Sequence, residues 1–263
     1  MASNPGLAAP ALNLGRLLQE RGRNVEAARI YALAQERGLD ASLFGHLLAA
    51  IEGKQAGAQA PPSYVRETFD AFAPGFEQRL VGELGYGVPD ALEALVCGPA
   101  GVADAGARLD ILDLGCGTGL VGDALGAKAK SLVGVDLSPR MLGEARSKGR
   151  YTDLQEADIA AWLADAEPAR FDLAVAADVF IYIGALEAVF AGVARCLRSP
   201  GWLAFSVESC GGDRWQLLPS GRYAQSEIYI AKLAARHGYT VCARQAAQIR
   251  RGAAGALYLL HKA

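Results

Sequence analysis

The chain has 263 residues, of which 52% are apolar, and its 26 basic and 28 acidic side chains give a net charge of −2. This is enough apolar material for a sizeable core, and the charge balance argues against a polyanion-binding surface, so nucleic acid is not an expected partner. Five widely spaced cysteines without a C-x-x-C pair argue against a disulfide framework and a structural zinc site, and we expect no metal. Without an apolar run of roughly 20 residues or a signal sequence, we expect a cytoplasmic protein that makes no membrane contact.

The first sixty residues differ in pattern from the rest of the chain. Apolar positions recur every three or four residues over 12–34 and 42–51, which predicts short amphipathic helices. The spacing of the following residues fits one tetratricopeptide (TPR) repeat: Leu14, Gly15, Leu18, Gly22, Ala27, Tyr31 and Ala34. Because a solenoid needs about three repeats, these helices either cap the main domain or dock a protein partner.

The stretch 53–62 has the composition of a linker. It separates a helical TPR-like segment (1–52) from a main domain (63–263). Ser63 can cap a helix at the start of that domain, and Tyr64, Phe69, Phe72 and Phe76 follow closely. These rings either pack the helix on the core or form a lid over a planar, cationic or apolar ligand.

From residue 109 onward, strand-like runs alternate with helical patterns. We predict strands at 109–114, 131–136, 151–157, 170–177, 201–208, 239–248 and 255–261. We predict helices near 119–127, 139–148, 159–165, 184–197 and 225–237. The alternation predicts an α/β doubly wound sheet with its ligand beyond the carboxyl ends of the strands. The last two strands are joined too closely for a parallel crossover, so they should form an antiparallel hairpin.

The stretch 109–119 reads Leu-Asp-Ile-Leu-Asp-Leu-Gly-Cys-Gly-Thr-Gly. Glycine tolerates positive φ and leaves no Cβ between backbone and ligand, so this pattern predicts a nucleotide-binding turn. One register places the dinucleotide fingerprint G-x-G-x-x-G on Gly117, Gly119 and Gly122, with Asp136 as the ribose acid. It would indicate an NAD(P)-dependent oxidoreductase.

The other register, Asp113-x-Gly115-x-Gly117-x-Gly119, resembles motif I of class I S-adenosylmethionine-dependent methyltransferases. Three later stretches also resemble motifs of this family: the strand ending at Asp136, Glu156-Ala-Asp158-Ile159, and 171–183. The resemblance implies a Rossmann-like α/β fold with sheet order 3-2-1-4-5-7-6 and an antiparallel last pair. It also implies S-adenosylmethionine as cofactor and S-adenosylhomocysteine as product.

Within this family, Asp136 would accept both ribose hydroxyls and Asp158 the adenine amino group. Together with two rings of the lid, the cofactor-binding candidates are Tyr64, Phe72, Asp113, Gly115, Cys116, Gly117, Asp136, Leu137, Met141, Asp158, Ile159 and Ala177. Other roles stay open, because Asp113 can hold the glycine loop and Asp136 and Asp158 can cap helices. The N-terminal pattern and the stretches 69–76, 177–184 and 220–226 also resemble bacterial predicted methyltransferases with an N-terminal TPR repeat.

Methyl transfer from a sulfonium is an in-line displacement in which alignment supplies much of the rate. A neutral hydroxyl or amine acceptor needs a group that takes its proton, whereas a carboxylate needs only an arginine beside it. Candidates for the acceptor pocket, in the loops after the fourth and fifth strands, are Asp178, Tyr182, Glu208, Arg214, Arg222 and Tyr223. Arg222 can instead tie its loop to the core.

We therefore predict methyl transfer to an O or N nucleophile, with a small-molecule acceptor favoured. The alternatives are an NAD(P)-dependent oxidoreductase and a non-catalytic partner-binding protein that holds S-adenosylmethionine.

Overall fold

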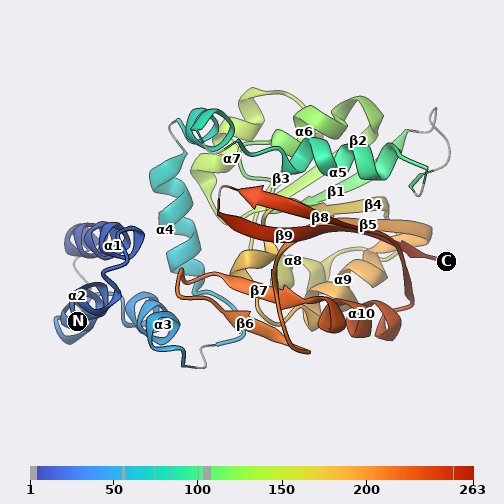
Figure 1. The fold of residues 1–263 in the computed structure, drawn as a ribbon. Coiled ribbons are helices and arrows are strands. Elements are labelled where there is room, and N and C mark those ends of the chain that lie inside the picture. The colour runs from blue at the N-terminus through green and yellow to red at the C-terminus, as the bar shows by residue number, and fades with distance from the viewer. Residues whose placement is uncertain are drawn as a thin grey trace.

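The computed structural model describes residues 5–54, 57–73, 75–83, 85–99, 101–102, 108–250 and 252–263. A twisted sheet with helices on both faces forms the body, and three N-terminal helices lie beyond one end of it (Figure 1). The strands are β1 (Leu109–Leu114), β2 (Ala129–Asp136), β3 (Asp153–Glu156), β4 (Phe171–Ala176), β5 (Leu197–Cys210), β6 (Trp215–Leu217), β7 (Tyr223–Ser226), β8 (Tyr239–Arg250) and β9 (Ala253–Lys262).

The N-terminal helices are α1 (Pro5–Glu20), α2 (Asn24–Glu36) and α3 (Ala41–Glu52), and α4 (Pro62–Phe72) joins them to the body. The helices of the body are α5 (Val88–Cys97), α6 (Leu120–Leu125), α7 (Pro139–Ser147), α8 (Ile159–Asp165), α9 (Glu187–Cys196) and α10 (Glu227–Arg236). Among the residues described, no helix is both long and apolar enough to cross a bilayer.

The sheet follows the order β3-β2-β1-β4-β5-β9-β8. Strands β1 to β5 pair in parallel, and β9 is antiparallel to both of its neighbours. Counted along the chain without β6 and β7, this is the predicted order 3-2-1-4-5-7-6 with an antiparallel last pair. The predicted fold class is thus confirmed.

Both faces of the central strands β1 and β4 are buried, as parallel strands require. Leu112 and Leu114 of β1 pack on the side covered by α8, α9 and α10. Ile111, one residue away and therefore on the opposite face, packs toward α5 and α6. The continuous apolar run that predicted β1 comes from this burial on two sides.

Two elements between β5 and α10 were not expected. The sequence predicted a loop there, but β6 and β7 form an antiparallel hairpin, and β7 pairs in parallel with the end of β5 at Ser209 and Cys210. This hairpin lies beside α3 in Figure 1. Helix α5, before β1, was not predicted either.

The N-terminal helices cross closely and pack against the body. A Cβ on Gly15 would lie 2.1 Å from Cε1 of Tyr31, so only glycine lets α1 and α2 approach this far. Phe44 and Leu47 of α3 share one buried cluster with Tyr64 of α4 and Tyr223 of β7. The match to a TPR repeat stays a prediction from the sequence.

The end of the predicted linker is fastened to the body. In residues 57–60, which we call the strap, the carbonyl oxygen of Ala58 accepts from the N–H groups of Gly184 (2.8 Å) and Ala185 (2.9 Å). The N–H of Ala60 donates to the carbonyl oxygen of Tyr182 (2.9 Å). The strap therefore runs along the loop that follows β4.

The predicted cap of α4 is wrong. Helix α4 begins after Pro61 without a side-chain cap, and Pro62 supplies the fixed φ of its first turn. The hydroxyl of Ser63 instead donates to Asp40 Oδ2 (2.9 Å), which links α4 to the start of α3.

Candidate active site

A cavity lies at the carboxyl ends of β1, β2, β3 and β4, on both sides of the point where the strand order reverses. Of the predicted cofactor-binding residues, those that line it are Gly115, Cys116, Gly117, Asp136, Leu137, Asp158, Ile159 and Ala177. Asp178 and Tyr182, predicted for the acceptor pocket, line it as well. The strand ends thus bring these residues together from four separate motifs.

The glycine loop after β1 exposes its backbone to the cavity. Gly115 and Gly117 have φ values of +70° and +53°, which favour glycine. A Cβ on Gly117 would meet nothing within 4 Å, whereas one on Gly115 would lie 2.5 Å from Cγ2 of Val179. The loop therefore stays close to the turn after β4 and leaves open space above Gly117.

The other two glycines of the stretch pack on a tyrosine. A Cβ on Gly119 or Gly122 would lie 3.1 or 2.7 Å from Cε2 of Tyr151, and neither glycine lines the cavity. In the dinucleotide register Gly119 is the second glycine, which must let the backbone approach the pyrophosphate. This packing therefore argues against that register.

Asp113 lies outside the cavity and is fully buried. Its Oδ2 accepts from the Tyr151 hydroxyl (2.6 Å), and the Tyr151 oxygen accepts from the Gly122 N–H (3.2 Å). Burial raises the pKa of Asp113 to about 7, opposed by the Tyr151 hydrogen bond and reinforced by the negative charge of Asp136. Asp113 therefore does not line the cavity as expected of a cofactor contact, and Tyr151 links it to Gly122 in the first turn of α6.

Asp136 joins the end of β2 to the glycine loop. Its Oδ2 accepts from the Gly117 N–H (2.9 Å) and its Oδ1 from the Ser138 N–H (2.8 Å). Ser138, whose Oγ accepts from the Met141 N–H (3.1 Å), is the cap of α7, so the capping role considered for Asp136 is wrong. Burial raises the pKa of Asp136, and the backbone hydrogen bonds oppose this shift.

Asp158 lines the cavity and also caps α8. Its Oδ1 accepts from the N–H groups of Ala160 (3.0 Å) and Ala161 (3.1 Å). Its Oδ2 accepts from Nε2 of Gln59 (2.8 Å), a strap residue that lines the cavity too. No sequence pattern marks Gln59 as a site residue, because its neighbours are the small residues of a linker.

The lid helix α4 turns a different face to the cavity than expected. Tyr64 and Phe72, eight residues apart, lie on one side of α4, where Arg16 Nη2 donates to the Tyr64 hydroxyl (3.2 Å) and the Arg16 guanidinium carbon lies 5.9 Å from the Phe72 ring centroid. Val65 follows Tyr64 and so points about 100° away from it, and it lines the cavity together with Phe69. Neither Tyr64 nor Phe72 lines the cavity, since both rings lie against Arg16 instead.

Met141 also lies outside the cavity, because it is fully buried within α7. The sequence missed Thr118, whose Oγ1 is buried beside the cavity without a hydrogen-bond partner among the described residues. Other cavity residues that were not predicted are Phe76, Leu80, Tyr86, Pro89, Leu120, Val121, Val179 and Ile183. Most of these are apolar, and no role was assigned to any of them, although Phe76 lies in the aromatic stretch and Val179 and Ile183 lie in the stretch 171–183.

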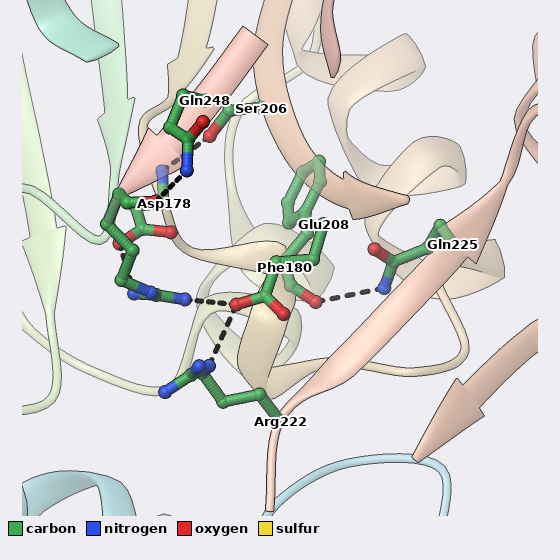
Figure 2. A network of polar contacts seen from close by, with 8 residues as sticks. Asp178, Phe180, Ser206, Glu208, Arg222, Gln225 and Gln248 are labelled. Atoms are coloured by element: carbon green, nitrogen blue, oxygen red, sulfur yellow. Dashed lines mark hydrogen bonds and ion pairs between the residues drawn. The ribbon is translucent and has the colours of Figure 1, made fainter. Parts of the chain in front are cut away.

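Asp178 lines the cavity two residues after the end of β4, whereas Asp136 ends β2 and Asp158 follows β3. It has a φ of +61°, and its N–H donates to Ser206 Oγ (2.8 Å), as Figure 2 shows. Its Oδ2 accepts from Nη1 of Arg250 (2.8 Å), whereas its Oδ1 is buried without a partner in the described structure. Burial raises the pKa of Asp178 to about 6, although the positive charge of Arg250 opposes the shift.

Arg222 and Tyr223 do not line the cavity. Nε of Arg222 donates to Oε1 of Glu208 (2.8 Å), which also pairs with Arg250 behind Asp178 (Figure 2). The hydroxyl of Tyr223 donates to the carbonyl oxygen of Gly57 (2.6 Å). The acceptor-pocket assignment is therefore corrected for both: Arg222 ties its loop to the core, and Tyr223 holds the strap.

The chain has recognisable relatives. The family described as "Methyltransferase domain" matches residues 111–201. A ubiquinone biosynthesis O-methyltransferase of Idiomarina loihiensis is 32% identical over 111 residues, which are 41% of this chain and 45% of that protein. The chain spans about half the length of the curated relatives it matches.

Solved structures share the fold. Magnesium protoporphyrin IX methyltransferase from Synechocystis, with bound S-adenosylhomocysteine, has a TM-score of 0.56 at 17% identity, covering 77% of this chain and 99% of that one. A didemethyltoxoflavin N1-methyltransferase from Burkholderia thailandensis has a TM-score of 0.55 at 20% identity, covering 79% and 92%. Residues 111–201 thus match a methyltransferase domain family. The strands of this stretch carry the glycine loop, Asp136, Asp158 and Asp178 of the cavity.

The residues that line the cavity fit S-adenosylmethionine. Acceptor oxygens of Asp136 and Asp158 suit a ribose diol and an amino group. The buried Thr118 hydroxyl, which has no partner among the described residues, suits a polar amino-acid end. The open space over Gly117 lets a ligand approach the backbone. The apolar side chain of Ile159 provides a surface for a flat ring.

Proposed function

We propose that this chain transfers a methyl group from S-adenosylmethionine to an oxygen or nitrogen atom of a small molecule. One observation carries the proposal: the glycine loop, Asp136, Asp158 and Asp178 all line a single cavity, and one carboxylate oxygen of Asp178 has no partner among the described residues. The O-methyltransferase and N1-methyltransferase named above support both acceptor types.

Asp136 would hold the ribose hydroxyls, Asp158 and Ile159 the adenine, and the loop 115–118 the amino-acid end. When bound, the cofactor supplies a methyl group made electrophilic by its sulfonium. The chain contributes mainly alignment, because the reacting groups must lie in line for displacement. Val65, Phe69 and Phe76 cover the cavity with apolar surface, which excludes water from the site.

Asp178 is the proton acceptor in this proposal. Arg250 occupies its Oδ2, which leaves Oδ1 for a hydroxyl or amine of the acceptor. A pKa of about 6 keeps the carboxylate ionised at neutral pH while leaving it a better base than an ordinary aspartate. No Lys, Arg or His lines the described cavity, so a neutral acceptor is favoured over a carboxylate.

Calorimetry with S-adenosylhomocysteine and NADH tests the cofactor. We expect the wild type to bind S-adenosylhomocysteine and not NADH, and Asp136→Ala to weaken that binding by roughly tenfold or more, since it removes hydrogen bonds to a charged acceptor. Asp153→Ala, an exposed aspartate on β3, is the control and should bind like the wild type. Preferential binding of NADH would overturn the proposal.

Catalysis needs a second experiment. A screen of hydroxyl- and amine-bearing small molecules for release of S-adenosylhomocysteine should find an acceptor. A chain that binds the cofactor but releases no product with any acceptor class would instead favour the non-catalytic alternative.

A further inference from the structure

The strap brings a polar side chain into the cavity from outside the stretch that matches the methyltransferase domain family. Gln59 lies 99 residues before Asp158, yet its Nε2 donates to Asp158 Oδ2 at 2.8 Å. The pair forms the part of the cavity where the proposed function places the adenine. Since the other carboxylate oxygen of Asp158 already caps α8, the hydrogen bond from Gln59 completes the support of this group.

The geometry points to Gln59 as a positioning residue for the adenine end of the cofactor site, an inference that rests on the proposed function. Its amide holds Oδ2 of Asp158 while backbone N–H groups hold Oδ1, so the carboxylate cannot rotate away from the cavity. A carboxylate fixed in this way accepts from an amino group and repels a carbonyl oxygen. The strap therefore helps the site to select adenine over a base with an oxo group at the same position.

The Gln59 amide can point only one of its two ends, the NH2 group, toward the Asp158 carboxylate. Only its NH2 group can donate to a carboxylate, and the reversed amide would place two oxygens against each other. The backbone of the strap does not depend on this side chain, because Ala58 and Ala60 make its hydrogen bonds to the loop after β4. Side-chain substitutions at Gln59 therefore leave the strap in place.

Residues of β7 and α3 also contact the strap. The Tyr223 hydroxyl donates to the carbonyl oxygen of Gly57, and Ala60 is fully buried in the cluster that includes Phe44 of α3. The N-terminal helices thus pack around the segment that carries Gln59. This makes the N-terminal part of the chain a contributor to the cofactor site.

The test compares binding of S-adenosylhomocysteine and S-inosylhomocysteine, in which an oxo group replaces the adenine amino group. Calorimetry is run on the full-length wild type, Gln59→Ala and Gln59→Leu. The matched control is Gln155→Leu, since Gln155 makes the same type of bond to Asp153 (2.7 Å) but is exposed and does not line the cavity. Thermal unfolding without ligand reports whether each variant is folded.

We expect both Gln59 variants to bind S-adenosylhomocysteine about tenfold more weakly and to lose most of the wild-type preference for it over the inosine compound. Gln155→Leu should keep both the affinity and the preference. A purely structural role would lower the unfolding temperature without changing the preference, and that result would overturn the inference. Unchanged binding by folded Gln59 variants would overturn it too, whereas failure of the wild type to bind either compound would overturn the proposed function itself.

Discussion

Two buried aspartates at the cavity differ in the groups that bind their carboxylate oxygens. Asp113 receives one hydrogen bond, from Tyr151, and Asp178 receives an ion pair from Arg250, while one oxygen of each lacks a partner in the described structure. A buried carboxylate without full compensation favours its protonated form. The pKa values of about 7 and about 6 follow from this environment.

Asp113 makes the stability of the protein depend on pH. Its folded pKa of about 7 lies above the ordinary value of 3.8, so its contribution to stability is complete below pH 3.8 and is lost as the pH rises through 7. Asp113→Asn, which keeps an oxygen for Tyr151, removes this loss. Between pH 5 and pH 8 the free energy of unfolding of the variant, relative to wild type, should rise by about 3 kcal/mol.

Urea unfolding at both pH values measures this difference, and Asp178 contributes equally to both proteins. Asp153→Asn, at an exposed position, serves as the control and should show no such change. A difference between Asp113→Asn and wild type that is the same at both pH values would contradict the shifted pKa.

Asp178 makes the proposed reaction depend on pH in the opposite sense. The carboxylate must be ionised to take a proton, so kcat/KM for the acceptor should rise through about pH 6 and then level off. Asp178→Asn should lose roughly 100-fold in kcat and this dependence, with unchanged binding of S-adenosylhomocysteine. Steady-state kinetics from pH 5 to pH 8 test this, and a variant with full activity at pH 8 would rule out the proton-acceptor role.

At the scale of elements, Tyr151 explains two of the four glycines that the sequence grouped together. It stands just before β3, and its ring fills the space beside Gly119 and Gly122, while its hydroxyl links Asp113 to the first turn of α6. Gly115 and Gly117 face the cavity instead. The first two glycines therefore line the cavity, and the last two serve packing.

Gly122→Ala should destabilise the protein. The new methyl group would lie 2.7 Å from the Tyr151 ring, which is overpacking and costs about 1–3 kcal/mol. Gly143→Ala in α7 is the matched control, because nothing lies within 4 Å of its Cβ and alanine favours a helix by about 1 kcal/mol. Urea unfolding should thus give opposite signs, and a stable Gly122→Ala would show that Tyr151 can move aside.

The sequence predicted the elements whose pattern comes from burial on both sides. Strand β1 was predicted at the bounds observed, because its apolar run ends where the glycines begin. The short strands β6 and β7 were missed since three or four residues between glycines carry no measurable period. The sheet order came from the family resemblance and agrees with the structure.

The site was predicted best where residues follow strand ends. Asp136, Asp158 and Asp178 could be placed together because parallel strands end at one edge of the sheet. Tyr64 and Phe72 were misassigned because periodicity shows that α4 has faces but not which face meets which neighbour. Gln59 could not be found, since its position depends on backbone pairing between segments far apart in the chain.

At the scale of the whole molecule, the N-terminal helices cover surfaces that the body cannot leave exposed. Tyr223 is fully buried, and its ring lies 5.8 Å from that of His46 in α3. A ring nitrogen of His46 lies 2.8 Å from the carbonyl oxygen of Gly221. These contacts favour the cap over a freely attached docking module, although a partner on the outer surface stays a proposal.

A chain that begins at Pro61 tests the cap. It lacks the strap and leaves Tyr64 and Tyr223 exposed, so we expect the unfolding temperature to fall by roughly 10 °C or more, as loss of several kcal/mol of apolar burial predicts. Val25→Ser in the full-length chain is the control, since Val25 is 69% exposed and its change should alter stability by at most about 0.5 kcal/mol. Binding of S-adenosylhomocysteine should fall as well, because Gln59 is removed. A shortened chain that unfolds at the wild-type temperature would show that the N-terminal helices are a separate module.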